Sequence, residues 1–258
     1  MTIKFGPAGL GAVKDAVENL EEFHRLGLKA CEIAFTYGVY IKNEKDMKEI
    51  KDVSKRLGIK LSIHAPYWIN LNSKDKDKVR KSKERILKCC EVGSKMGVEI
   101  VVFHSGYYGE MDKEECYLNI KERVKEMLEV IKDKRWKIKL APETMGKINV
   151  FGSVEQIARL VKDTGCSFCL DFAHILARDK KIDFKEIKRL FSEYKEWHCH
   201  FSGIEYGEKG ERKHIGTSYE NWEKLLQELP KDKEIVIINE SPSMVDDAVE
   251  GLRISKEI

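Results

Sequence analysis

The sequence predicts an α/β protein, a (β/α)8 barrel in which eight parallel strands alternate with helices. Short, nearly continuous runs of Val, Ile and Leu recur along the chain, as expected for parallel strands that are covered on both faces. Most of these runs are followed by a longer segment with helical periodicity. The alternation runs through all 258 residues without a break in composition. Because the length also suits one barrel, we expect a single domain over residues 1–258.

Eight segments are expected to form the strands because they are short, apolar and bounded by turn or helix signals. In chain order they are Ile3–Phe5, Ala30–Phe35, Lys60–His64, Glu99–His104, Ile138–Glu143, Ser167–Asp171, Trp197–Phe201 and Ile235–Glu240. A doubly wound open sheet is the alternative arrangement for such strands. The Gly-x-Gly-x-x-Gly turn of dinucleotide-binding open sheets follows none of them, which favours the closed barrel.

The helices are indicated by apolar residues at helical spacing and by signals at their ends. Several are followed by a glycine that can supply the left-handed cap, as in Leu57-Gly58. Ser153 and Gln156 form a capping-box start for another. In chain order the expected helices are Ala12–Leu26, Lys45–Leu57, Asp77–Met96, Lys113–Ile131, Ser153–Asp163, Phe184–Tyr194, Tyr219–Leu229 and a last one from about Met244.

Two loops are longer than a barrel needs: Pro66–Lys76 after the third strand and Ser202–Gly216 after the seventh. Both follow the C-terminal ends of strands, the rim on which barrels of this kind carry their active sites. We therefore expect the active site at this rim, with these loops contacting the substrate.

Composition and charge set broad limits on partners and compartment. The net charge of +3 neither demands nor excludes a nucleic acid. No run approaches the ~18 apolar residues of a membrane span, and the first twenty residues lack the apolar region of a signal peptide. The seven cysteines are therefore expected to be reduced, and Cys166 and Cys169 to face opposite sides of a strand. These features predict a cytoplasmic protein without a membrane partner.

The strand ends carry an unusual set of His, Asp and Glu side chains, which indicates metal ions because charged groups are rarely buried unless paired or metal-bound. A single histidine would more often be structural, and a single Asp more often a helix cap. Seven such residues at successive strand ends favour ligands, in a mixture that suits Zn²⁺, Mn²⁺ or Fe²⁺. The candidates are Glu143, Asp171, His200 and Glu240 for one ion, His64 and His104 with a bridging Glu143 for a second, and His174 for a third.

Several segments, in order along nearly the whole chain, together resemble the endonuclease IV family of apurinic/apyrimidinic endonucleases. They are Ser62–Leu71, Val102–Gly106, Ala141–Thr144, Leu170–His174 and Asn239–Ser241. The resemblance implies a xylose-isomerase-like (β/α)8 barrel, a TIM barrel, with two or three zinc ions, Mn²⁺ being possible at some sites. It also implies a monomer that acts on double-stranded DNA in base excision repair. The phosphodiester 5′ to an abasic site would be hydrolysed by a metal-activated hydroxide.

Carried over by residue, the resemblance assigns His64, His104 and Glu143 to one zinc, and Glu143, Asp171, His200 and Glu240 to the second. Glu143 would be the catalytic residue, because it would bridge two ions and orient the nucleophile. His174 would belong to the third zinc.

The third site departs from the family pattern. Its other ligands form an Asp-x-His motif in the family, but direct alignment puts Glu211 and Lys213 at those positions, and an ammonium cannot bind a metal. Either His214 serves with a shift of one residue, partnered by Glu211, or the third ion is weak or missing. We expect the shift.

The loop after the third strand is implied to contact DNA through Tyr67, Trp68 and Asn70. The flat ring of Trp68, where the family has a smaller aliphatic residue, could act as a stacking wedge. The alternative is that Tyr67 and Trp68 pack on the neighbouring helix. Cations on the rim loops could hold the DNA backbone or simply be solvated; they are Lys42, Lys74, Lys76, Lys209 and Arg212.

Two other functions remain open. A sugar isomerase or epimerase on a related barrel would use Glu143, Asp171, His200 and Glu240 around a single ion such as Mn²⁺. The departure at the third site favours this reading, whereas His174 and the Pro66–Leu71 loop speak against it. A barrel that only binds nucleic acid or metal is the third possibility, which the complete ligand set makes less favoured.

Overall fold

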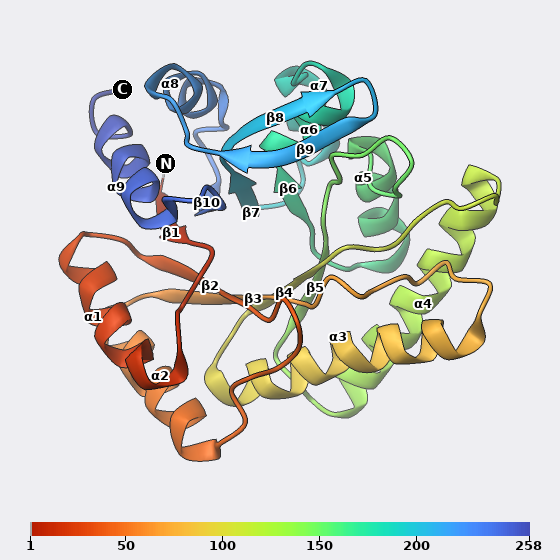
Figure 1. Cartoon of the computed structure of the whole chain (residues 1–258), viewed down its shortest axis with the longest axis horizontal. Helices are drawn as coiled ribbons and strands as arrows, with labels where there is room; N and C mark the ends of the chain where they lie inside the picture. Colours follow the sequence, from red (N-terminus) through yellow and green to blue (C-terminus); the bar gives the residue numbers. More distant parts are fainter. Residues whose placement is uncertain (1) are drawn as a thin grey trace.

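The computed structural model describes residues 2–258 and has an α/β TIM barrel fold, which confirms the predicted fold class. Parallel strands lie at the centre and helices surround them (Figure 1). The barrel strands are β1 (Thr2–Pro7), β2 (Ala30–Ala34), β3 (Lys60–His64), β4 (Ile100–Phe103), β5 (Lys139–Pro142), β6 (Cys169–Asp171), β7 (Glu196–Phe201) and β10 (Glu234–Asn239).

Two four-stranded sheets join at both edges to close the barrel. Their strand orders are β1-β10-β7-β6 and β2-β3-β4-β5. At one seam the Lys29 N–H donates to the Phe5 carbonyl over 3.0 Å, and at the other the Thr144 N–H donates to the Cys169 carbonyl over 3.0 Å. The first seam requires glycine at position 6, since a Cβ there would lie 1.9 Å from the Ala30 carbonyl oxygen. Closure brings the C-terminal ends of all eight strands to one rim.

The helices lie outside the barrel. All but one were predicted, but the first begins four residues later than expected and the one from Phe184 ends four residues earlier. They are α1 (Ala16–Arg25, after a 3-10 turn at Val13–Asp15), α2 (Glu44–Leu57), α3 (Lys76–Met96), α4 (Lys113–Asp133), α5 (Val154–Thr164), α6 (Phe172–Asp179), α7 (Phe184–Leu190), α8 (Tyr219–Glu228) and α9 (Met244–Ile254). Gly58 caps α2 with a φ of 67°, and the Ser153–Gln156 capping box of α5 forms as expected. No helix within residues 2–258 is long and apolar enough to cross a membrane.

Two features of the rim differ from the sequence-based expectation. The helix α6 was not predicted; it starts immediately after β6, and the Asp171 Oδ1 caps it by accepting the His174 N–H over 2.8 Å. The expected Ser202–Gly216 loop is an antiparallel hairpin of β8 (Gly203–Gly207) and β9 (Gly210–Ile215). Neither has a clear sequence signal, because α6 is short and mostly apolar and the hairpin lacks polar-apolar alternation. The hairpin lies across the barrel opening (Figure 1).

Candidate metal centre

Side chains from strands far apart in the sequence meet at the C-terminal rim. His64, Asp171 and His200 lie at or near the ends of β3, β6 and β7, and face the barrel axis because strand side chains alternate. His104, Glu143 and Glu240 each come one residue after the strand itself, at the ends of β4, β5 and β10. All the residues proposed as metal ligands from the sequence are brought together here.

Glu143 lies at the middle of this cluster and is fully buried. Its Oε2 is 3.1 Å from His64 Nε2 and 3.0 Å from His104 Nε2. Its Oε1 is 3.3 Å from His174 Nδ1 and 3.4 Å from His200 Nδ1. The two oxygens therefore face different histidine pairs, which is the arrangement that a bridging carboxylate needs.

Glu143, Asp171, His200 and Glu240 form one group whose ligand atoms all lie within 4.8 Å of one another. Three atoms at its centre, Glu143 Oε1, Asp171 Oδ2 and His200 Nδ1, are buried and make no hydrogen bond. Unpaired buried charge is costly unless a cation satisfies it. A divalent ion of the kind bound by mixed imidazole and carboxylate ligands fits this group.

Two of the histidines are held with Nδ1 anchored at a backbone carbonyl and Nε2 directed toward other candidate ligands. His64 Nδ1 lies 2.8 Å from the Ala65 carbonyl, and His174 Nδ1 lies 3.0 Å from the Thr144 carbonyl. Because carbonyls only accept, each Nδ1 carries the proton and each Nε2 is free to bind a metal. Such anchoring is typical of metal-binding histidines.

Electrostatics at the centre are strongly perturbed. Burial alone would raise the pKa of Glu143, but the surrounding histidines, His104 first, hold that pKa well below its usual value. Burial raises the pKa of Asp171 to about 6, and the carboxylates of Glu240 and Glu143 add to this shift. Two carboxyls in one group with pKa values shifted in opposite directions are typical of a functional site.

A third group contains Asp171, His174 and His214, at the hairpin. His214 Nε2 is 3.3 Å from His174 Nε2, and Glu211 Oε2 is 3.4 Å from the same atom. Lys213 instead points to Glu205, with 3.2 Å between Nζ and Oε1.

A β-bulge in the hairpin accounts for this arrangement. Lys213 pairs with Glu205 and Glu211 pairs with Tyr206, so Arg212 is an extra residue in β9. One extra residue reverses the alternation of side chains beyond it. Glu211 and His214 therefore face the same side although they are three residues apart, and the one-residue shift expected for His214 has a structural cause.

Replacing His214 with alanine is therefore expected to lower the metal content by up to one ion per chain. The matched change Lys213→Ala should leave the metal content unchanged, because its ammonium faces Glu205. Elemental analysis of both purified variants measures this. Equal metal content in the two variants would remove His214 from the ligand set.

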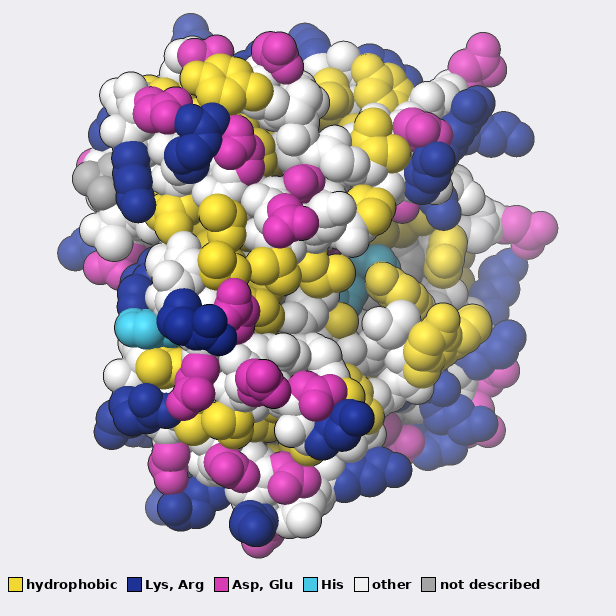
Figure 2. Space-filling model, turned by 60° about the vertical axis from the view of Figure 1, so that its left-hand side comes forward, with side chains coloured by type: hydrophobic (Ala, Val, Ile, Leu, Met, Phe, Trp, Pro, Cys, Tyr) yellow, Lys and Arg dark blue, Asp and Glu magenta, His cyan; other side chains and the backbone are white. Residues whose placement is uncertain are grey.

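A cavity of about 260 Å³ opens beside these groups, and its walls include His104, Glu240, His214 and the side of Tyr67. Figure 2 shows histidine at the bottom of a hollow in one face of the molecule. The Tyr67 ring stacks on His104 with 5.6 Å between centroids. Trp68 is 63% exposed, so most of the residue is open to solvent at the rim.

Asn70, which the resemblance implies to contact DNA, has a side chain that also takes part in the structure of its own loop. Its side-chain oxygen accepts the Asn72 N–H over 3.1 Å and faces the Tyr107 N–H at 3.5 Å. Its own N–H donates to Ser82 Oγ over 3.0 Å. Asn70 therefore holds the loop after β3 in shape, which positions Tyr67 and Trp68.

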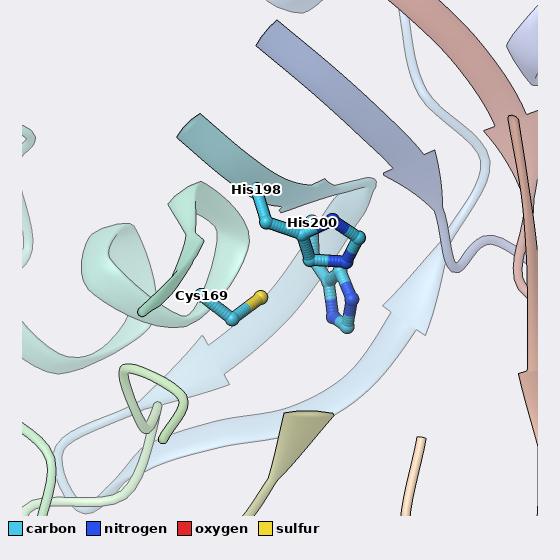
Figure 3. Close-up of side chains that lie close together, drawn as sticks. All are labelled: Cys169, His198 and His200. Atoms are coloured by element: carbon cyan, nitrogen blue, oxygen red, sulfur yellow. The ribbon is translucent and has the colours of Figure 1, made fainter. Parts of the chain in front are cut away.

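Glu32, which was not predicted as a site residue, is a fully buried carboxylate in β2 beneath the metal centre. Its Oε2 accepts from Ser62 Oγ over 2.8 Å and from His198 Nε2 over 3.2 Å, and its Oε1 lies 3.0 Å from His200 Nε2. The signal was a charged residue inside the apolar run Ala30-Cys31-Glu32-Ile33-Ala34. Cys169, on the neighbouring strand β6, also lies close to His198 and His200 (Figure 3).

Comparison with known proteins gives a family match over most of the chain. The family model described as xylose isomerase-like TIM barrel matches residues 20–258. An uncharacterized protein of Methanocaldococcus jannaschii is 33% identical over 98% of this chain and 97% of its own length. A probable endonuclease 4 of Acholeplasma laidlawii is 26% identical over 76% of this chain and 75% of its own length.

Solved structures of two different enzyme types resemble the fold equally well. Endonuclease IV from Thermus thermophilus matches with a TM-score of 0.73 and 20% identity, covering 100% of this chain and 98% of that one. D-psicose 3-epimerase from Clostridium cellulolyticum matches with a TM-score of 0.73 and 16% identity, covering 100% and 99%. Shape alone therefore does not choose between these chemistries.

Proposed function

Because the chain belongs to the family of xylose isomerase-like TIM barrels, we propose that it is a metal-dependent endonuclease that cuts duplex DNA 5′ to an abasic site. The observation that carries this proposal is that the ligand group of Glu143, Asp171, His200 and Glu240 shares residues with two other candidate ligand groups. One group, His64, His104 and Glu143, shares Glu143 with it, and the other, Asp171, His174 and His214, shares Asp171. A single-ion isomerase needs neither.

The proposed ions are two or three zinc ions, with Mn²⁺ possible at some sites, and the residues present fit such a cluster. Bound there, such ions would position a phosphate and lower the pKa of a water molecule toward neutrality. Glu143 would be shared between ligand groups, because its two oxygens face different histidine pairs. Asp171 would hold its ion through Oδ2 while Oδ1 caps α6, which fixes the carboxylate in place.

The overall reaction is hydrolysis. The water oxygen bonds to phosphorus as the bond from phosphorus to the 3′ oxygen breaks, and the 3′ oxygen leaves with a proton. The products are a 3′-hydroxyl and a 5′-phosphate on the abasic sugar. Burial, with the nearby carboxylate of Glu240, raises the pKa of Tyr67 to about 12, so its hydroxyl keeps its proton. Tyr67 can therefore donate a hydrogen bond to a phosphate oxygen in the cavity that it lines.

The rim around the cavity suits damaged DNA because it carries exposed aromatic side chains. Tyr37, Trp68 and Tyr107, on the loops after β2, β3 and β4, are 85%, 63% and 52% exposed. Exposed rings at a rim can stack on bases or enter a gap in the duplex. The proposed backbone contacts are exposed residues of the loops after β2 and β3, the start of α3 and the β8–β9 hairpin, namely Lys42, Lys74, Lys76, Lys209 and Arg212.

Replacing Trp68 with alanine is expected to weaken discrimination between abasic and intact duplex by about 5- to 100-fold, the value of one stacking contact of ~1–3 kcal/mol. Binding of the two duplexes, compared by fluorescence anisotropy, measures this. Leu26→Ala is the control, because Leu26 is 36% exposed at the C-terminal end of α1, just before β2 begins, and so lies at the opposite end of the barrel from the rim loops. Unchanged discrimination in the Trp68 variant would assign this side chain no part in recognition.

A one-ion sugar epimerase is the second candidate. It is favoured by the four-residue group itself, which alone can hold one ion beside two carboxylates, Glu143 and Glu240. In that reaction one carboxylate would remove a proton from a sugar carbon and the other would return one to the opposite face.

One assay separates the two candidates. Metal-loaded protein is incubated with a duplex that carries one abasic site, with the same duplex lacking it, and with ketohexoses. The proposal predicts chelator-sensitive nicking of the abasic duplex alone, leaving a 3′-hydroxyl. Epimerised ketose without nicking would replace the nuclease proposal with the epimerase.

A further inference from the structure

We propose that Glu32 is a positioning residue for the metal centre, which fixes His200 so that its Nδ1 faces the ion held with Glu143, Asp171 and Glu240. The inference rests on the metal-binding part of the proposed function and is independent of the DNA substrate. Glu32 is a buried carboxylate that binds no proposed ion itself and lies one layer deeper in the barrel than the ligands.

The histidines of the metal centre are anchored in two different ways. His64 and His174 each donate Nδ1–H to a backbone carbonyl. His64 Nε2 then faces Glu143, and His174 Nε2 faces His214 and Glu211. His200 is reversed: its Nδ1 lies 3.2 Å from Glu240 Oε1 and 3.4 Å from Glu143 Oε1, and its Nε2 points down into the barrel. The group opposite this Nε2 is the Glu32 carboxylate, at 3.0 Å from Oε1. Among these three histidines, His200 alone has a charged anchor.

The Glu32 carboxylate is itself held in place by hydrogen bonds from two other strands. Ser62 Oγ and His198 Nε2 both donate to Oε2, so this oxygen is fixed from β3 and β7. The remaining oxygen, Oε1, is buried and has no aligned hydrogen bond. Oε1 lies 3.0 Å from His200 Nε2, so His200 is the side chain that this oxygen can hold in place.

A carboxylate behind a metal-binding imidazole strengthens the bond to the metal. An imidazole that binds a dication through Nδ1 becomes a stronger N–H donor at Nε2, and a carboxylate partner strengthens both that hydrogen bond and the metal bond. Loss of such a partner typically costs 10- to 100-fold in metal affinity. Barrel interiors are normally filled by bulky apolar residues, so a carboxylate at this depth is otherwise costly.

A competing arrangement uses the same residues. The ligand atoms of Cys169, His198 and His200 lie within 4.8 Å of one another, and Figure 3 shows the Cys169 thiol directed toward the two imidazoles. An ion there would use His198 and His200 as ligands and would compete with their contacts to Glu32. However, His198 already uses Nε2 to donate to Glu32, so the hydrogen-bonded arrangement explains more of the observed contacts.

The test is metal affinity of the full chain with Glu32→Gln, measured by competition with a chromophoric zinc chelator. We expect one ion to bind 10- to 100-fold more weakly, while the ion of His64 and His104 keeps its affinity. Thermal unfolding of the metal-free variant serves as the folding control. A lower melting temperature with unchanged affinity for every ion would make Glu32 merely structural and overturn the proposal.

A double-mutant cycle makes the assignment to His200 specific. In a His200→Ala background, Glu32→Gln should cause little further loss of metal affinity, because the residue it positions is gone. In a His104→Ala background the two losses should add, because His104 belongs to another ligand group. Additive losses in both backgrounds would contradict the proposed coupling.

Cobalt substitution distinguishes the competing ion. With Co²⁺ in place of zinc, the proposal predicts only imidazole and carboxylate ligands and therefore no thiolate-to-metal charge-transfer band. A strong near-ultraviolet band that disappears in Cys169→Ser would place an ion among Cys169, His198 and His200 and would overturn the positioning role. These readouts require no nicking activity, so a failed nuclease assay and a failed positioning role remain distinct results.

Discussion

Replacing Glu143 with glutamine is expected to lower nicking of abasic duplex by roughly three orders of magnitude or more while duplex binding persists. Glutamine is nearly isosteric, but its amide nitrogen cannot bind a cation, so one side of the bridge between the two histidine pairs is lost. A thousandfold effect corresponds to about 4 kcal/mol of transition-state stabilisation, within the range that metal ions supply. Binding should survive because a duplex is held mainly through its phosphates.

Single-turnover cleavage and anisotropy on the same duplex measure the two effects separately. Glu205→Gln is the matched control, since Glu205 lies on β8, pairs with Lys213 and stays outside the ligand groups. It should cleave at the normal rate. Unchanged cleavage by the Glu143 variant would refute the bridging role, and a loss of binding equal to the loss of cleavage would assign Glu143 to substrate affinity alone.

Removing the metal is expected to abolish nicking and to make the folded state sensitive to alkaline pH. In the metal-free protein, burial opposes the charged form of His64, but Glu143 raises the His64 pKa to about 9. An unfolded histidine has a pKa of about 6.5. Between these values the folded state holds the extra proton, so its stability decreases as the pH rises through this window.

The full shift corresponds to about 3 kcal/mol of unfolding free energy that is present below pH ~6.5 and lost by pH ~9. His174 and His200 shift in the same direction, so they add to the trend. The metal-loaded protein should lack this decline, because metal-bound histidines are neutral at both ends of the window. Urea unfolding of chelator-treated and metal-loaded protein between pH 6.5 and 9 measures it. A metal-free protein that gains stability with rising pH would contradict these pKa shifts.

The fold was predictable because its signals are local and repeated. Each barrel strand is a short apolar run, and the glycine after a helix, such as Gly58, marks its end through backbone sterics alone. The predicted strand ends at His104 and Glu143 each lie one residue beyond the last strand residue in the structure. Once the strands are known, closure of the barrel brings their C-terminal ends together.

The parts that could not be predicted depend on contacts between distant segments. The bulge at Arg212, which turns His214 rather than Lys213 inward, exists because β9 pairs with β8, and no local pattern specifies it. The use of Asn70 to hold its loop depends on Asn72 and Tyr107 meeting it in space. Glu32 was overlooked because a single charge in a strand is informative only when its partner on β7 is known.

The central claim is that imidazoles and carboxylates from six strand ends hold a cluster of divalent ions. Elemental analysis of the purified full-length protein, with protein concentration from amino-acid analysis, tests this most directly. We expect two to three equivalents of zinc per chain, which remain bound through gel filtration and are removed only by a strong chelator. One equivalent or less would contradict it.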